Sequence, residues 1–142
     1  MAKNDVFEND LLKLIFNGVP IAGLADNAAV PTTQLYVSLH TASPGEDGNQ
    51  STSETSYGAY TRIPVSRSAG GWAVVNNTAT NNVNVNFPQC ATGTSTITHV
   101  GVGTDETGAG KLLYSGALGA SLNVSPGVQP AFNVGGLTIS EE

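Results

Sequence analysis

The first stretch of the chain carries apolar residues at helical spacing, three or four positions apart. Those that share one stripe are Phe7, Leu11, Leu14 and Ile15. The segment Asp5–Glu8 is typical of a capping box, in which Asp5 accepts from a backbone amide and Glu8 reaches back. Gly18 favours a left-handed stop, and Pro20 prevents the helix from resuming. We therefore predict one α-helix at about residues 5–17.

The apolar face of this helix needs a cover, and the sequence leaves two covers open. One is the protein's own β-sheet, and the other is a neighbouring subunit of an oligomer. The candidate contacts with a neighbouring subunit or other partner are Phe7, Leu11, Leu14 and Ile15. Residues 18–34 show no clear period, so residues 1–34 are interpreted as a helix followed by an ordered connecting arm.

From Leu35 onward, apolar and polar residues alternate with a period of two, which predicts strands. Glycine, asparagine and proline separate the short runs, and Pro64 favours an edge position for its strand. The expected strands are 35–40, 59–65, 72–75, 82–87, 96–102, 111–118, 120–125, 128–133 and 137–140. The expected fold class is mainly β: an antiparallel β-sandwich, jelly roll or barrel over residues 35–142, preceded by one N-terminal α-helix.

One long irregular stretch interrupts this pattern, residues 41–58 (TASPGEDGNQSTSETSYG). Loops of this length are usually functional or mobile, and its polar, acidic composition places it at the surface. Two interpretations stay open: a solvated loop, and an arm that becomes ordered against a partner.

Composition supports the β prediction and narrows the partners. The 142 residues fit one domain, and they include 17 Gly, 15 Thr, 13 Asn and 12 Ser, a mixture of strand and turn formers. The net charge is −6, with only five scattered basic residues, so we expect no binding to nucleic acid. The single cysteine cannot form an internal disulfide, the acidic N-terminus does not read as a signal peptide, and no apolar run suits a membrane helix. We expect a soluble protein that folds in a reducing cytoplasm.

The residues that invite a chemical interpretation do not assemble into a known motif. In the glycine-rich run 101–111 (GVGTDETGAGK), Asp105 stands where a Walker loop needs glycine, and Lys111 precedes leucine, so a hairpin connection is expected. His40, His99 and Cys90 are too few for a zinc site and are interpreted as structural. We assign no catalytic, metal or cofactor residues, and we expect a protein that is not an enzyme, with no cofactor and no small-molecule substrate.

Two long segments carry a resemblance to known proteins: residues 35–46 (LYVSLHTASPGE), and residues 98–104 with 108–118 (THVGVGT and GAGKLLYSGAL). Shorter matching positions lie between them, at Ser53, Glu54, Tyr57, Tyr60, Thr61, Arg62, Val65, Arg67, Gly71 and Trp72. Together they resemble a family of small virion structural proteins of tailed bacteriophages, often described as tail-fibre-like or capsid decoration proteins. The resemblance implies a virion component.

The expected shape of the chain favours one position in the virion. A receptor-binding fibre is usually long, with repeats or a trimeric stalk, whereas a compact β domain suits a head decoration or cement protein on the capsid exterior. Such a protein would bind the major capsid protein and itself, as a homotrimer or homodimer. The alternatives are a tail-tip, tail-fibre-associated or head–tail junction component, and a carbohydrate-binding module with Trp72, Tyr57 and Tyr60 as candidate aromatics.

Overall fold

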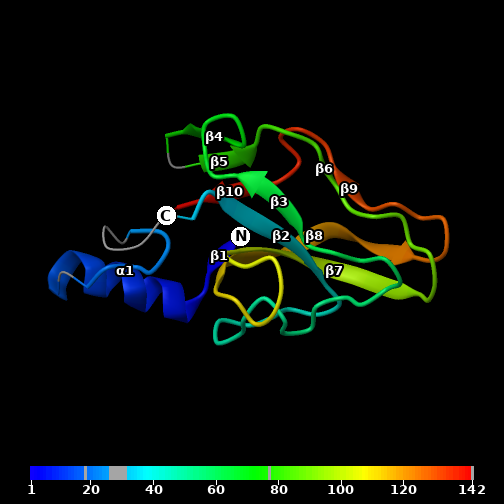
Figure 1. The fold of residues 1–142 in the computed structure, drawn as a ribbon, viewed down its shortest axis with the longest axis horizontal. Coiled ribbons are helices and arrows are strands. Elements are labelled where there is room, and N and C mark those ends of the chain that lie inside the picture. Colours follow the sequence, from blue (N-terminus) through cyan, green and yellow to red (C-terminus); the bar gives the residue numbers. More distant parts are fainter. Residues whose placement is uncertain (18, 26–31, 77, 142) are drawn as a thin grey trace.

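The structure is a computed structural model that describes residues 1–17, 19–25, 32–76 and 78–141, with the side chains of 12–17 outside the description. Figure 1 shows α1 at one end of the molecule and strands crossing in two layers over the rest. The elements are β1 (Ala2–Lys3), α1 (Asp5–Asn17), β2 (Gln34–His40), β3 (Ile63–Ser66), β4 (Trp72–Val75), β5 (Thr78–Asn81), β6 (Val85–Asn86), β7 (Ser95–Gly103), β8 (Leu112–Val124), β9 (Ala131–Phe132) and β10 (Thr138–Ser140).

The strands form a five-stranded sheet of order β1-β8-β7-β2-β3, a three-stranded sheet of order β10-β5-β4 and the pair β6-β9. Every pairing between these strands is antiparallel. The sheets enclose a common core, to which both layers contribute Val37, Leu39, Trp72, Val85, Phe87, Ile97 and Ile139. The predicted mainly β, antiparallel fold with one N-terminal helix is confirmed.

The predicted helix is present over Asp5–Asn17, but Asn4 caps it rather than Asp5. The side-chain oxygen Oδ1 of Asn4 accepts from the backbone N–H of Val6 at 3.0 Å. Its Nδ2 donates to the carbonyl of Gly48 at 2.7 Å, so the same buried side chain fixes the helix start to the 41–58 loop. Asparagine caps as well as aspartate does, and only Asn4 sits where it can make both contacts.

Several strand boundaries differ from the sequence prediction. The strand expected at 59–65 begins only at Ile63, because Ala59 has φ 79° and Tyr60 closes a turn onto Tyr57. The strand expected at 82–87 shrinks to β6. The side-chain amide of the buried Asn81 donates to the carbonyls of Val83 and Asn133, which takes the chain out of the sheet and leaves Val83 exposed.

The two strands expected at 111–118 and 120–125 are one continuous strand, β8. The register of its pairing with β7 shifts between Ile97 and His99. Ile97 pairs with Leu122, whereas His99, only two residues further along β7, pairs with Ala117. The break expected between the two strands, at residue 119, is therefore not a turn but part of a β-bulge or similar irregularity, in which the strand continues with extra residues on one side. The strand expected at 128–133 narrows to β9, and β1 and β5 were not predicted at all.

Candidate assembly surfaces

Of the four candidate contact residues on α1, the structure describes the side chains of Phe7 and Leu11. Phe7 is 9% exposed and packs edge-on against Tyr114 of β8, with ring centroids 5.6 Å apart. It forms a small core with Ile21 and Leu113, against which Leu11 is partly buried. Phe7 therefore covers the protein's own sheet, the first of the two alternatives that the sequence left open.

The far part of α1 keeps the other alternative open. The side chains of Leu14 and Ile15 lie outside the described residues, so their contact with a neighbouring subunit stays a prediction. The helix is also held by an ion pair between Asp10 and Lys111, at the start of the hairpin strand β8. The first turns of α1 are thus fixed to the domain on which they sit.

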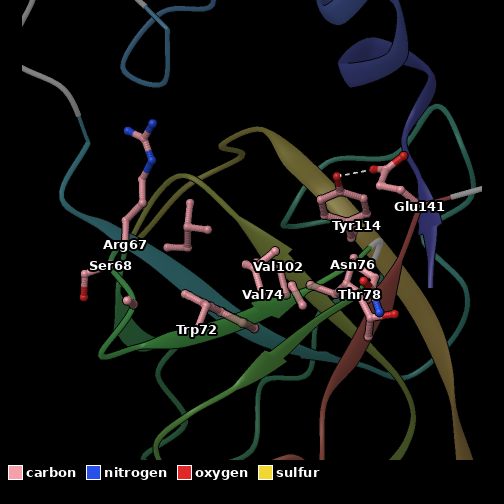
Figure 2. Close-up of a pocket in the computed structure, with 13 residues that line it drawn as sticks. Arg67, Ser68, Trp72, Val74, Asn76, Thr78, Val102, Tyr114 and Glu141 are labelled. Atoms are coloured by element: carbon pink, nitrogen blue, oxygen red, sulfur yellow. Dashed lines mark hydrogen bonds between the residues drawn. The ribbon is translucent and has the colours of Figure 1, made fainter.

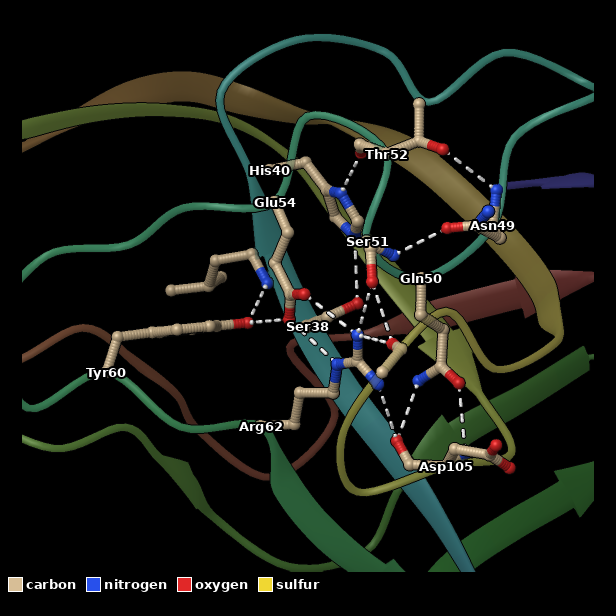
Figure 3. Close-up of polar contacts among 12 residues, drawn as sticks. Ser38, His40, Asn49, Gln50, Ser51, Thr52, Glu54, Tyr60, Arg62 and Asp105 are labelled. Atoms are coloured by element: carbon tan, nitrogen blue, oxygen red, sulfur yellow. Dashed lines mark hydrogen bonds and ion pairs between the residues drawn. The ribbon is translucent and has the colours of Figure 1, made fainter.

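A buried polar network surrounds Arg62 (Figure 3). Arg62 is 5% exposed, and its guanidinium meets Glu54 in a two-pronged contact, Nε to Oε1 and Nη2 to Oε2, both 2.8 Å. The hydrogen bonds to Glu54 are the main cause that raises the pKa of Arg62. The remaining guanidinium N–H groups donate to the carbonyls of Asp105 at 2.9 Å and Gly108 at 2.6 Å. One side chain therefore ties the 41–58 loop to the β7–β8 connection.

Tyr60 and Gln50 complete this network. The Tyr60 hydroxyl donates to Glu54 Oε1 at 2.8 Å and accepts from the backbone N–H of Leu39 at 3.1 Å, and burial raises its pKa. Gln50 is fully buried, and its amide both accepts from the N–H of Asp105 at 2.9 Å and donates to the same residue's carbonyl at 3.2 Å. These contacts fix parts of the 41–58 loop to the domain, while much of the loop is exposed; whether it also becomes ordered against a partner stays a prediction.

The glycine-rich run acquires a role from these contacts. A Cβ atom at Gly103 or Gly110 would overlap the Gln50 side chain, and one at Gly101 would lie 2.8 Å from His40 Nε2 and from Ser38 Oγ. Glycine at these positions makes room for buried polar side chains. The expected hairpin connection is confirmed, since β7 and β8 pair up to Gly103 and Leu112 on its two sides.

The other residues that invited a chemical interpretation are also structural in their surroundings. His40 Nδ1 lies 2.9 Å from the carbonyl of Thr52, so it donates, and Nε2 accepts from Ser38 Oγ at 2.8 Å. Burial lowers the pKa of His40, which favours this neutral form. Cys90 is buried and its Sγ faces the carbonyl of Thr92. Among the described residues, no group of histidine, cysteine and acidic side chains could hold a metal ion.

An apolar cleft opens between the two layers at the end that faces α1, with a volume of about 700 Å³ (Figure 2). One wall is formed by β2, β7 and β8, and the other by β4, β5 and β10. The apolar side chains of the two walls are Leu35, Val102 and Tyr114, and Trp72, Val74, Ala79 and Ile139. We call this feature the β4 cleft. Figure 2 shows Arg67 at one end of it and Glu141 at the other.

The charged groups at the ends of the β4 cleft are both engaged within the chain. Arg67 donates to the carbonyls of Leu24 at 2.7 Å and Thr32 at 3.0 Å. Glu141 accepts from Lys3 Nζ at 2.8 Å and from the Tyr114 hydroxyl at 2.5 Å, and its contact with Lys3 is the main cause that lowers its pKa. The apolar walls between these ends face open space.

The aromatics proposed for carbohydrate binding do not form an exposed platform. Trp72 is 8% exposed and Tyr57 is 4% exposed, and both belong to the common core. Tyr60 is partly buried and lies edge-on to Tyr57 and stacked near Phe87. Stacking of a sugar needs an aromatic face open to solvent, so these residues do not support that alternative.

The described residues thus form a β-sandwich in which polar clusters hold loops together and the β4 cleft is lined mostly by apolar side chains. A sequence model described as podophage GP4 fiber I protein gp80 matches residues 2–140. The chain belongs to this family, which is one of phage virion structural proteins, and the resemblance found in the sequence is confirmed.

None of the curated proteins compared with the chain matches it. No helix in the described part of the chain is long and apolar enough to span a membrane. The sequence analysis indicated the family but did not find the polar network around Arg62. One feature of the sequence could have indicated it: Arg62 is a charged residue in a strand-like segment of a chain that has very few charges.

Proposed function

We propose that this chain is a non-enzymatic subunit of a phage fibre, and that it acts by binding other virion proteins. The description of the family as a fibre protein supports this position over the others. The observation that carries the structural role is the contrast between polar groups satisfied inside the chain and an open apolar cleft. A catalytic site needs reactive polar groups directed at an opening, whereas most of the wall surface here is apolar and the two charged residues at its ends, Arg67 and Glu141, are engaged within the chain.

A second candidate is the head decoration or cement protein expected from the sequence. It is favoured by the shape of the chain, since the described residues form one small sandwich with a single helix and no stalk. Decoration proteins act through many modest contacts, and their summed strength comes from the high effective concentration of a lattice. In this role the partners would be the major capsid protein and further copies of this chain.

The position in the virion separates the two candidates. Immunogold labelling of intact virions, combined with copy number from quantitative mass spectrometry, should place the label on the fibres at a low copy number. Label spread over the head at a copy number comparable to that of the capsid protein would support decoration instead. Absence of the chain from purified virions would contradict both, and a capsid-protein antibody provides the matched control for labelling efficiency.

A further inference from the structure

The start of α1 is held by a turn around Asp47. The backbone N–H of Asp5 donates to the carbonyl of Glu46 at 3.0 Å, and the side-chain Nδ2 of Asn4 donates to the carbonyl of Gly48 at 2.7 Å. Asn4 is buried and is the residue that caps the helix. The two carbonyls that hold the helix start therefore lie on either side of a single residue, Asp47.

The residue after Asp47 is a glycine, and the packing requires it to be one. Asp47 is the only aspartate of the sequence that precedes a glycine, since the others precede valine, leucine, asparagine or glutamate. A Cβ atom at Gly48 would lie 2.1 Å from the carbonyl oxygen of Pro44. Without a Cβ atom, the backbone nitrogen of glycine can approach a neighbouring carboxyl group closely. The fold therefore keeps together the two residues that can close a five-membered imide ring.

The groups that would react in this ring closure are not engaged elsewhere in the described part of the chain. Asp47 is exposed, and no described group accepts a hydrogen bond from the N–H of Gly48. The N–H of the next residue, Asn49, donates to Thr52 Oγ1 at 3.0 Å. The contacts with α1 use carbonyl oxygens, so they leave the Asp47 carboxyl and the Gly48 nitrogen available.

We propose that the Asp47–Gly48 peptide is a site of spontaneous covalent modification, at which aspartate is converted to isoaspartate. The backbone nitrogen of Gly48 attacks the carboxyl carbon Cγ of protonated Asp47. A C–N bond forms, and the carboxyl hydroxyl leaves as water with the amide proton. Water then opens the succinimide at its main-chain carbonyl, which breaks the bond from that carbonyl to nitrogen and restores the N–H. The chain now runs through the former side chain, its mass is unchanged, and no oxidant or reductant takes part.

The modification changes the spacing of the two carbonyls that hold α1. Isoaspartate lengthens the backbone between Glu46 and Gly48 by one methylene group, so both carbonyls cannot keep their present positions against the helix start. When the Gly48 carbonyl moves away, the buried Nδ2 of Asn4 loses its acceptor, which weakens the cap. The start of α1 is thereby released from the loop. The inference goes beyond the proposed function, because it concerns a change in the chain over time at either position in the virion.

Incubation of the purified full chain for several weeks at physiological temperature tests the site. We expect isoaspartate at residue 47, detected with protein isoaspartate methyltransferase and located by peptide mapping without a change in mass. Asp47→Glu should lose this signal, because glutamate would have to close a six-membered ring. Asp105→Glu, at another exposed aspartate, is the matched control and should leave the signal unchanged. The readout is restricted to the peptide containing residue 47, because Asn17 also precedes a glycine and its deamidation would change the mass.

Hydrogen–deuterium exchange of the isoaspartate form, separated by chromatography, tests the structural consequence. The amides of residues 5–8 should exchange about fivefold faster or more, the effect expected when a helix cap is lost, whereas those of β7 should not change. Absence of isoaspartate at residue 47, or an unchanged signal in the Asp47→Glu variant, would overturn the proposed site. Isoaspartate with unchanged exchange at residues 5–8 would overturn the release of α1. Neither result would affect the proposed function, which is measured separately in virions.

Discussion

Two regions of this sandwich differ in how their side chains are covered. Around Arg62, the hydrogen-bonding groups of Arg62, Glu54 and Gln50 find partners within the chain, and two loops are fixed as a result. On β4, the apolar side chains of Val74 and Val75 are left open to solvent. The first region has its polar groups paired within one copy of the chain, whereas the second leaves apolar surface uncovered.

This difference shows that a chain with so few charged residues can still fix its loops through polar contacts. The pair of Glu54 and Arg62 is the example, since burial makes its hydrogen bonds strong. Of the six large hydrophobic side chains that are exposed in the described residues, Val74 and Val75 on β4 are the most exposed. Polar contacts therefore supply internal order in one region, while the other leaves apolar surface open to solvent.

The largest effect should come from removing the centre of the network. Arg62→Ala leaves Glu54 buried without its cation and two carbonyls without donors, and it should lower the free energy of unfolding by about 3–5 kcal/mol. Arg67→Ala, which removes an exposed guanidinium, should cost about 1 kcal/mol or less and is the control. Urea denaturation measures both. Equal losses for the two variants would show that the network is not the more important of the two sites.

A smaller loss is expected when the space around Gln50 is filled. Gly103→Ala places a methyl group against the buried Gln50 side chain and should cost about 1–3 kcal/mol. Gly119→Ala, in the same hairpin, has open space around the new methyl group and should stay within about 0.5 kcal/mol of the unmodified chain. The same denaturation experiment distinguishes them, and an unaffected Gly103→Ala variant would contradict the close packing described.

The network also makes stability depend on pH through His40. Burial lowers the pKa of His40 in the folded state, so below the ordinary histidine value of 6.5 the unfolded chain binds more protons than the folded chain does. The stabilisation is present above pH 6.5 and is lost as the pH falls toward the lowered folded-state pKa. The His40→Gln variant should lose this part of the slope between neutral and acidic pH. An unchanged slope would mean that other groups cause it.

The smallest effect on folding is expected at the β4 edge. Val74→Thr should change the free energy of unfolding of the monomer by about 0.5 kcal/mol or less, because the side chain is already exposed. The same substitution at Val102, buried on the opposite wall of the cleft, introduces a hydroxyl into the core and should cost about 1–3 kcal/mol. A large loss at Val74 would indicate that β4 already has a cover within the chain.

The sequence predicted the elements whose periodicity is long and regular. The helix over 5–17 and the strands β2, β4, β7 and β10 were all expected at nearly their observed positions, because each is a run of apolar residues bounded by turn formers or, in the helix, a stripe at helical spacing. Pro64 correctly indicated an edge, since proline cannot donate to a neighbouring strand.

Features that depend on long-range contacts could not be predicted. The run Ala59–Arg62 alternates like a strand, but the turn at Tyr57 and the capture of Arg62 by two loops prevent it from pairing. The 41–58 loop has a surface composition, yet Gln50 within it is fully buried because its amide is satisfied by Asp105, more than fifty residues away. The composition of a segment indicates its average preference for solvent. The burial of a single residue depends instead on the hydrogen-bonding groups that the fold brings next to it.

Hydrogen–deuterium exchange, measured on the isolated chain and on the chain assembled in virions, tests the central contrast most directly. The amides of 41–58 and 104–111 that are held by the Arg62 network should exchange slowly in both states. The amides of 72–76 should exchange quickly in the isolated chain and slow down on assembly. Protection that increases in the two network loops while β4 stays unprotected would contradict the account.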